Sequence, residues 1–304
     1  MREVLEAYFL RPDAALVRSA EIYALKTLGF AFTGCSMDLG GGDGIFSFLY
    51  CGGKLHPDYD LHREASLALN ETGKIYDIIQ ELGDIRVVEK PAINCPFTNL
   101  DISQTLLARS RRLNMYKEYI RHDISNVDSF DDRKYDCIFS TILMYFDNPR
   151  LVLENVRRRL SKGGVMSCCV PLPRYQNNTF PNKYSNLPEI QRFVELIDAG
   201  RTARRKRFWD IDEWIDHFKS VGFSVDGYQT YLSDEAVQML ELSTRLASPP
   251  LIKIYNEQSL ENRREHKMSL VDAISPVLSA FLEAESTLSA SQGGNYVAFM
   301  CVAN

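Results

Sequence analysis

The sequence predicts an α/β protein in which strands and helices alternate around a largely parallel sheet. Between residues 35 and 171, apolar runs of strand length alternate with stretches whose apolar residues recur at helical spacing. A glycine-rich turn, residues 40–44, joins the first of these runs to the helix that follows it. The chain has 304 residues, of which 45% are hydrophobic, so it can form one large domain with an ample core.

The segment CSMDLGGGDGIFSFL, residues 35–49, carries the strongest signal. Its first part can form a buried strand, and the residues after the glycines can begin a helix whose N-terminal N–H groups face a ligand. A dinucleotide-binding loop has the spacing GxGxxG, with an acid about 20 residues later. Here Asp38 precedes the glycines, and Ile45 stands where the third glycine would be needed. The segment therefore predicts a different nucleotide cradle, the alternative being an ordinary glycine-rich corner.

The acid and the glycines match a known motif. Asp38, Gly40, Gly42 and Gly44 fit the pattern (D/E)xGxGxG, and the chain resembles the class I S-adenosylmethionine-dependent methyltransferases, whose first motif this is. The resemblance implies that these residues and Gly41, where many relatives carry cysteine, surround S-adenosylmethionine. The product of the cofactor would be S-adenosylhomocysteine.

Residues 98–112, TNLDISQTLLARSRR, read as a strand end followed by an amphipathic helix. They resemble the second strand of the family, and the resemblance implies that Asp101 accepts hydrogen bonds from the two ribose hydroxyls, with Ile102 beside it. Asp38 and Asp101 are about sixty residues apart where the family commonly has about twenty, so we expect residues 51–97 to form an insertion.

Asp58 or Asp60 would restore the short spacing and is the rival candidate for the ribose acid. Asp101 is preferred because DIS followed by LLxxA matches the family's second-strand passage more closely. The distance from Asp101 to the next acid, Asp123, also fits the family.

The following segments occur in the family's order. Asp123 ends a third strand, and the resemblance implies that it meets the adenine amino group, with Ile124 beside it. Residues 135–140 form a fourth strand, rich in aromatic and β-branched residues, and Ser140 at its end is a further implied cofactor contact. An amphipathic helix, a turn at residues 163–164 and a fifth strand complete this part.

The resemblance implies a class I methyltransferase Rossmann-like fold, with a seven-stranded, mostly parallel sheet and helical insertions that form a lid. The last strand of the chain would run antiparallel between the fifth and sixth strands. The expected units are an N-terminal helical cap (1–33), a cofactor-binding core (34–172, with 51–97 inserted), and the rest of the core (173–304, with a helical acceptor-side insertion at 234–294).

The acceptor is expected at the carboxyl edge of the sheet, where open α/β folds bind ligands. The two insertions, together with the loop of residues 173–208, would cover that edge and select the acceptor. These segments lie outside the recognisable motifs, so the resemblance says little about the acceptor. A small-molecule or glycan-type acceptor is expected, while the oligomeric state is not readable.

Methyl transfer is an in-line displacement, which needs alignment in a dry site and requires no metal in principle. An alcohol acceptor must also lose its proton, so a histidine base would favour O-methylation over N-methylation. His62 is the preferred base because the acids in DYDLH could orient its ring. Tyr145 follows the fourth strand and could touch the acceptor or the methionine end of the cofactor. The remaining candidates for the base are His56, His122, His217 and His266.

Charge and cysteine content exclude several classes of substrate and site. The net charge is −5, which argues against a nucleic-acid substrate, although the basic run of residues 201–209 could hold a phosphate on the acceptor or be a solvated helix face. No run approaches 18 apolar residues, and no CxxC occurs among the seven cysteines. We therefore expect a cytoplasmic protein with free thiols, no membrane insertion and no metal site.

Two other functions stay open. Polyamine synthases carry a GGGDG run similar to residues 40–44 and transfer a different alkyl group in the same cleft. They place amine-binding aspartates after the fourth strand, where TILMYFDNP offers only Asp147. The second alternative is a module that binds the cofactor without catalysis.

Overall fold

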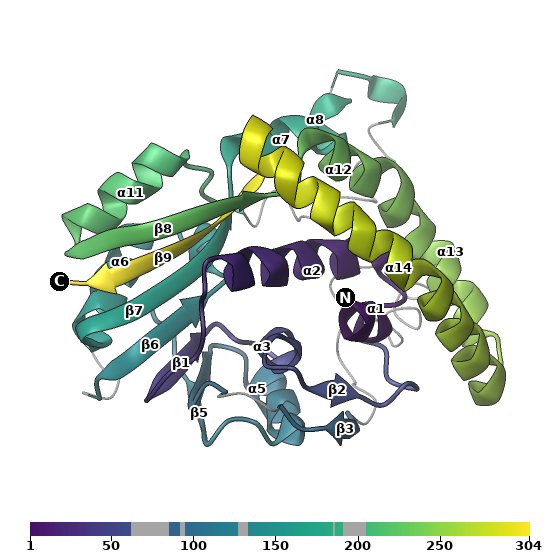
Figure 1. Ribbon diagram of the computed structural model, residues 1–304, viewed down its shortest axis with the longest axis horizontal. Coiled ribbons are helices and arrows are strands. Elements are labelled where there is room, and N and C mark those ends of the chain that lie inside the picture. The colour runs from purple at the N-terminus through teal and green to yellow at the C-terminus, as the bar shows by residue number, and fades with distance from the viewer. Residues whose placement is uncertain (62–84, 92–94, 127–132, 185, 191–204) are drawn as a thin grey trace.

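The structure, a computed structural model, describes residues 1–61, 85–91, 95–126, 133–184, 186–190 and 205–304. Its centre is a seven-stranded sheet in the order β5-β4-β1-β6-β7-β9-β8 (Figure 1). The strands are β1 (Ser36–Leu39), β4 (Thr98–Asp101), β5 (Glu118–Arg121), β6 (Tyr135–Ser140), β7 (Leu160–Pro171), β8 (Phe223–Tyr231) and β9 (Tyr296–Ala303). The last strand, β9, is antiparallel to β7 and β8, and the pairs among the first five strands are parallel. This arrangement confirms the predicted class I methyltransferase fold.

Helices flank both faces of the sheet and extend beyond one edge of it (Figure 1). The α-helices are α1 (Arg2–Ala7), α2 (Pro12–Thr27), α3 (Ile45–Tyr50), α5 (Gln104–Ser110), α6 (Pro149–Arg159), α7 (Pro173–Asn178), α8 (Phe180–Lys183), α11 (Ile211–Ser220), α12 (Asp234–Met239), α13 (Arg245–Asn256) and α14 (Leu260–Gln292). The short elements are η1 (Arg111–Leu113), η2 (Leu143–Tyr145), η3 (Pro188–Ile190), the π-helical turn η4 (Leu240–Thr244) and the antiparallel ribbon of β2 (Lys54–Leu55) and β3 (Val87–Glu89).

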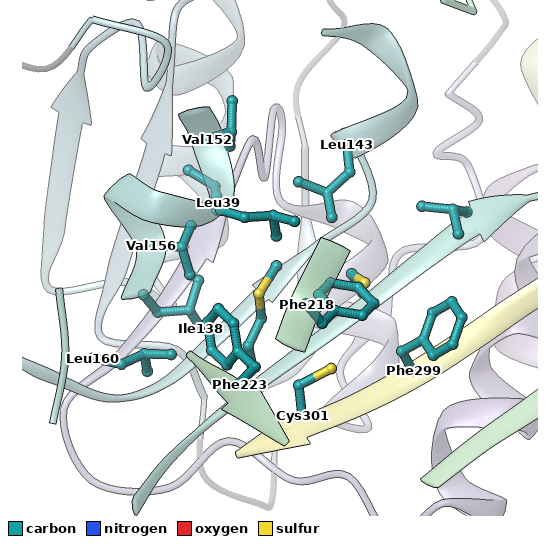
Figure 2. Close-up of a cluster of buried hydrophobic side chains, with 14 of the residues drawn as sticks. Leu39, Ile138, Leu143, Val152, Val156, Leu160, Phe218, Phe223, Phe299 and Cys301 are labelled. Carbon is teal, nitrogen blue, oxygen red and sulfur yellow. The ribbon is translucent and has the colours of Figure 1, made fainter. Parts of the chain in front are cut away.

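One face of the sheet packs against α6 and α11. Val152 and Val156 of α6 and Phe218 of α11 belong to one cluster with side chains of the central strands, and each of these residues is almost fully buried (Figure 2). Trp214 of α11 belongs to the same cluster and is 0% exposed. Burial of this apolar surface ties the late helix to the sheet.

The other face packs against α2, and α14 covers α1, α2 and β8 (Figure 1). Leu16 and Leu25 of α2 are buried against the sheet, and Leu282 of α14 and Val237 of α12 join the same cluster. This face therefore lies under helices from both ends of the chain, with α2 in contact with β8 and β9 and α14 in contact with β8. No helix in the described part of the chain is both long and apolar enough to cross a membrane.

Local sequence signals explain where several helices begin. The Ser103 hydroxyl accepts a hydrogen bond from the Leu106 N–H at the start of α5. A reciprocal capping box between Asp210 and Glu213 starts α11. Asn148 caps α6, whose first residue is proline.

The fifth strand begins earlier than the sequence indicates. Residues 163–164 were expected to form a turn before it, but β7 starts at Leu160 and continues through both glycines. The register against β6 shifts between Tyr135 and Cys137, and Gly163 takes φ +74°. Glycine accommodates this irregularity within the strand, which is why the pair could be mistaken for a turn.

Candidate functional site

The turn after β1 requires glycine at three of its positions. Gly40, Gly42 and Gly44 have φ values of +71°, +56° and +75°, a region that strongly favours glycine. A Cβ at Gly40 would also lie 2.3 Å from the Ile142 side chain. The turn therefore lies directly against the segment that follows β6.

Asp38 lies beneath the turn and supports it. Its side chain accepts hydrogen bonds from the hydroxyls of Ser47 and Tyr116, each at 2.6 Å, and the residue is 3% exposed. Burial raises the pKa of this carboxyl to about 6, although both hydrogen bonds lower it. A Cβ at Gly41 would lie 2.5 Å from the Asp38 Cγ, so the buried acid excludes a side chain at this position.

Asp101 lies at the end of β4, next to the turn. Its Oδ2 accepts the Gly42 N–H at 3.0 Å, and its Oδ1 accepts the Ser103 N–H at 2.7 Å. Burial raises the pKa of Asp101, while the two N–H donors oppose that shift. Ile102 beside it is 62% exposed, which leaves an apolar side chain at the rim of the site.

Asp60, a rival for the role of ribose acid, is bound elsewhere. Its Oδ2 accepts the Leu10 N–H at 3.0 Å, and it lines a small hollow with Tyr255 and Lys267. Asp58 lines the same hollow. The structure thus brings Asp101, and neither of these acids, to the glycine turn.

The remaining expected cofactor contacts lie near the ends of the neighbouring strands. Asp123 is exposed two residues beyond β5, and its pKa is lowered by hydrogen bonds from the Ser125 hydroxyl and N–H. Ile124 is 5% exposed and packs in the core. Ser140 is buried at the end of β6, where its hydroxyl accepts the Ile142 N–H at 3.3 Å.

The residues present fit S-adenosylmethionine. The Asn99 Oδ1 is buried beside the glycine turn and has no hydrogen-bond partner among the described residues, while its Nδ2 donates to the Gly42 carbonyl at 3.1 Å. Asp101 would hold the ribose hydroxyls, since a carboxylate accepts from two donors. Ile102, exposed beside Asp101, would contact the cofactor, and the carboxylate of Asp123 would accept a hydrogen bond from the adenine amino group.

A cavity of about 190 Å³ lies where β6 and β7 end. It is lined by residues of α2, η2, α7, α12, η4 and the ends of β8 and β9, and by Thr141, whose neighbour Ile142 lies against Gly40 of the glycine turn. The lining residues used below are Arg18, Glu21, Met144, Tyr145, Tyr175, Arg205 and Tyr296. Arg18 donates to Glu21 at 2.6 Å and lies 5.2 Å from the ring centre of Phe46 in α3, so this arginine contacts both the cavity and the helix that follows the turn.

Of the two expected catalytic residues, the structure places one at this cavity. Tyr145 lines it and is 44% exposed. His62 lies outside the described residues. No described histidine lines the cavity: His56 contacts Asp58, and the others lie beside Asn126, Trp209 and Gln258 (respectively His122, His217 and His266).

The described residues of the basic run do not all face the same way. Residues 201–204 lie outside the described part, while Arg205 turns into the cavity. Lys206 forms an ion pair with Asp147 at 3.0 Å, and Arg207 donates to the Asp147 carbonyl, so both are surface cations. The sequence had indicated the run but could not show which arginine points inward.

Other cavity residues were not predicted. Glu21 and Arg18 belong to an N-terminal helix without a motif, and Tyr296 begins the last strand. Each stands far in sequence from the glycine turn, and only the tertiary fold brings them together. Among the residues that the structure describes, no group of three or more His, Cys, Asp or Glu could hold a metal ion.

Comparison with known proteins gives one family match. The family model described as a methyltransferase domain matches residues 84–168. No curated protein is similar enough to the chain to count as a match.

Solved structures resemble the chain at a distance. One is a possible histamine N-methyltransferase of Thermotoga maritima, at 13% identity and TM-score 0.47 over 98% of this chain and 97% of that one. Another is an S-adenosylmethionine-dependent methyltransferase of Mesorhizobium loti, at 15% identity and TM-score 0.47 over 94% of this chain and 99% of that one. Likenesses this distant say nothing of the acceptor.

The matched region runs from before β4 into β7 and includes Asp101, Asp123 and Ser140. The glycine turn with Asp38 lies before it, on the strand that pairs with both β4 and β6. Strand order, glycine turn and the methyltransferase-domain match over residues 84–168 together support a class I S-adenosylmethionine-dependent methyltransferase, with S-adenosylmethionine as its cofactor.

Proposed function

We propose that this enzyme methylates a small-molecule or saccharide-type acceptor at oxygen, without a metal ion. The observation that carries the proposal is the cavity of about 190 Å³ at the ends of β6 and β7. Its size suits a small molecule or one residue of a larger one, because ligand sites of this kind are concave and bury most of what they bind.

The charges support an acceptor other than nucleic acid. The net charge is −5, and of the described cations in the basic run Lys206 and Arg207 are engaged with Asp147. A nucleic-acid site needs a surface of unpaired cations along the backbone of its ligand.

The carboxylates at the cavity support metal-independent transfer. Asp13 forms a bidentate pair with Arg11, Glu21 pairs with Arg18, and Glu241 accepts the Phe180 N–H. Each carboxylate is thus engaged by the protein. A metal-dependent transferase would instead need several of them directed at one point.

The chain's own residues would divide the work of the reaction. When bound, the cofactor supplies an electrophilic methyl group on a sulfonium. Asp101 and the glycine turn would fix its position, and the walls of the cavity would exclude water and align the acceptor oxygen. We propose that Tyr145 contacts the acceptor and that His62 is the base that removes its proton.

We also propose that the chain consists of a helical cap at 1–33 and two parts of the core, 34–172 and 173–304. Within the core, the segments at 51–97, 173–208 and 234–294 would form a lid over the acceptor. Tyr175 and Arg205 from the second segment and Val237 from the third line the cavity, which supports this division. A cytoplasmic location is proposed as well, supported by the seven cysteines, which are all thiols.

The first test is calorimetric titration with S-adenosylhomocysteine. Asp101→Asn should weaken binding by about tenfold or more, since it removes a charged acceptor from the ribose. Asp60→Asn, a matched carboxylate of the rival assignment, should leave the affinity within about twofold.

The second test follows tritium from labelled cofactor into hydroxylated small molecules and into their O-blocked analogues. We expect transfer to free hydroxyls, with the same rate in the presence of EDTA. Transfer to nucleic acid or only to amines, or its loss with EDTA, would contradict the proposal.

A further inference from the structure

Arg205 is a guanidinium in the cavity wall that has no carboxylate partner among the described residues. Its Nη1 donates a long hydrogen bond of 3.5 Å to the Tyr296 hydroxyl, and its buried Nε has no hydrogen-bond partner among the described residues. The Cζ lies 4.5 Å from the ring centre of Tyr175 and 5.9 Å from that of Tyr296. Arginine stays protonated in proteins, so a positive charge with spare donors faces this space.

The other cations of the cavity are already neutralised. Arg18 donates to Glu21 at 2.6 Å, and Arg11 makes two hydrogen bonds with Asp13, at 2.8 and 2.6 Å. Among the described arginines that line the cavity, Arg205 is therefore the one that can still bind an anion. A buried guanidinium with unused donors is costly in the absence of a ligand.

The main chain holds this guanidinium in place. The N–H groups of the next two residues, Lys206 and Arg207, both donate to the Met144 carbonyl in η2, at 2.8 and 3.2 Å. The aromatic rings of Tyr175 and Tyr296 confine the side chain itself. An arginine fixed in this way loses little conformational entropy when it binds a ligand.

Strand order separates Arg205 from the cofactor's half of the site. The expected cofactor contacts follow β1, β4, β5 and β6, whereas Arg205 packs on the first residue of β9 and on α7, which follows β7. Neighbouring strands are about 4.8 Å apart, so β9 lies three strand spacings from β1. Arg205 thus lies on the acceptor side.

We infer that the acceptor carries a carboxylate and that Arg205 binds it, orienting the acceptor with its reacting oxygen toward the glycine turn. This inference rests on the proposed function and specifies its substrate class. A single unpaired guanidinium matches one negative charge and the flat, two-oxygen geometry of a carboxylate. The tyrosine rings around it suit a ring-bearing body.

The experiment uses the full-length protein saturated with S-adenosylhomocysteine. Benzoic, phenylacetic and 4-hydroxybenzoic acids are compared with their primary amides, which have similar shapes and no charge, by saturation-transfer NMR titration. We expect at least one acid to bind about tenfold or more tightly than its amide. Arg205→Met should lower the affinity for that acid by about tenfold to a hundredfold and change the affinity for its amide by less than about threefold. The matched control is Lys206→Met, which removes a neighbouring surface cation and should change neither the affinity for the acid nor that for the amide.

A second measurement addresses the cofactor's own carboxylate, the other anion that could reach this cavity. Native protein and Arg205→Met are titrated with S-adenosylhomocysteine and with methylthioadenosine, which lacks the amino-acid part. We expect both affinities to stay within about threefold, which also shows that the variant is folded. A loss of about tenfold for S-adenosylhomocysteine alone would assign Arg205 to the cofactor and overturn the inference.

The inference also fails if no acid binds, if acids and amides bind equally, or if Arg205→Met leaves the acid unaffected. Failure of the proposed function gives a different result. In that case the native protein would bind acids through Arg205 but transfer no label to any hydroxylated small molecule.

Discussion

Asp38→Asn is expected to make the ligand-free protein more stable at neutral pH. Asp38 is 3% exposed and lies beneath the glycine turn. Burial raises the pKa of its carboxyl from 3.8 to about 6, with Asp101 and Asp43 adding smaller contributions in the same direction. Asparagine keeps an oxygen for the hydroxyls of Ser47 and Tyr116 and removes the buried charge.

The magnitude follows from the pKa difference between the folded and unfolded states. An acid whose pKa is higher when folded binds more protons in that state, so its contribution to stability falls as pH rises between the two values. For Asp38 this window runs from 3.8 to about 6, and above it the accumulated cost is about 3 kcal/mol. Asp38→Asn should therefore gain about 3 kcal/mol at pH 7 and less than about 1 kcal/mol at pH 4.

Urea unfolding of both proteins, followed by circular dichroism from pH 4 to pH 8, measures this difference directly. The matched control is Asp136→Asn, which alters an exposed carboxylate that accepts the Cys35 N–H and should change stability by less than about 1 kcal/mol at every pH. A stability difference for Asp38→Asn that is the same at pH 4 and pH 7, or a loss at pH 7, would refute the reasoning.

Two further predictions concern stability. Gly41→Ala should cost about 1–3 kcal/mol in urea unfolding, because the new Cβ would lie 2.5 Å from Asp38; Gly227→Ala, where the nearest atom is at 3.5 Å, should cost clearly less. Asp234→Ala should cost about 1–3 kcal/mol at pH 7, since it removes the acceptor for two Arg174 hydrogen bonds at 2.6 and 2.8 Å. Burial opposes these bonds, but they hold the pKa of Asp234 below its ordinary value, so the difference should disappear as pH falls through that pKa; an unchanged difference at low pH would contradict this.

The arrangement around the glycine turn could be predicted because each part of it is a local pattern. An acid, glycines at fixed spacing and an apolar strand are contiguous around Asp38, and a second acid ends the strand at Asp101. The parallel register then places these ends together, with Asp38 opposite Asn99 in the neighbouring strand. Asp101 lies at the glycine turn despite its distance in sequence from Asp38, because the strand that it ends pairs in parallel with β1.

The acceptor half could not be predicted in the same way. Arg18 and Glu21 come from α2, Tyr145 from η2 and Arg205 from the segment before α11, and no periodicity relates them. Their proximity depends on how helices from both ends of the chain pack on one face of the sheet. For the same reason no local pattern distinguishes Arg205 from the other arginines of the basic run.

The geometry of the sheet explains why the residues around the glycine turn could be predicted and those on the acceptor side could not. Strand ends at the carboxyl edge have fixed spacing, so a ligand common to a whole family can be held by residues set in the strands. Arg205 instead depends on two N–H groups bound to the Met144 carbonyl and on rings from α7 and β9. These supports can change without disturbing β1 or β4. Motifs for the cofactor therefore carry no information about Arg205, whose guanidinium has no carboxylate partner among the described residues and from which we infer a carboxylate on the acceptor.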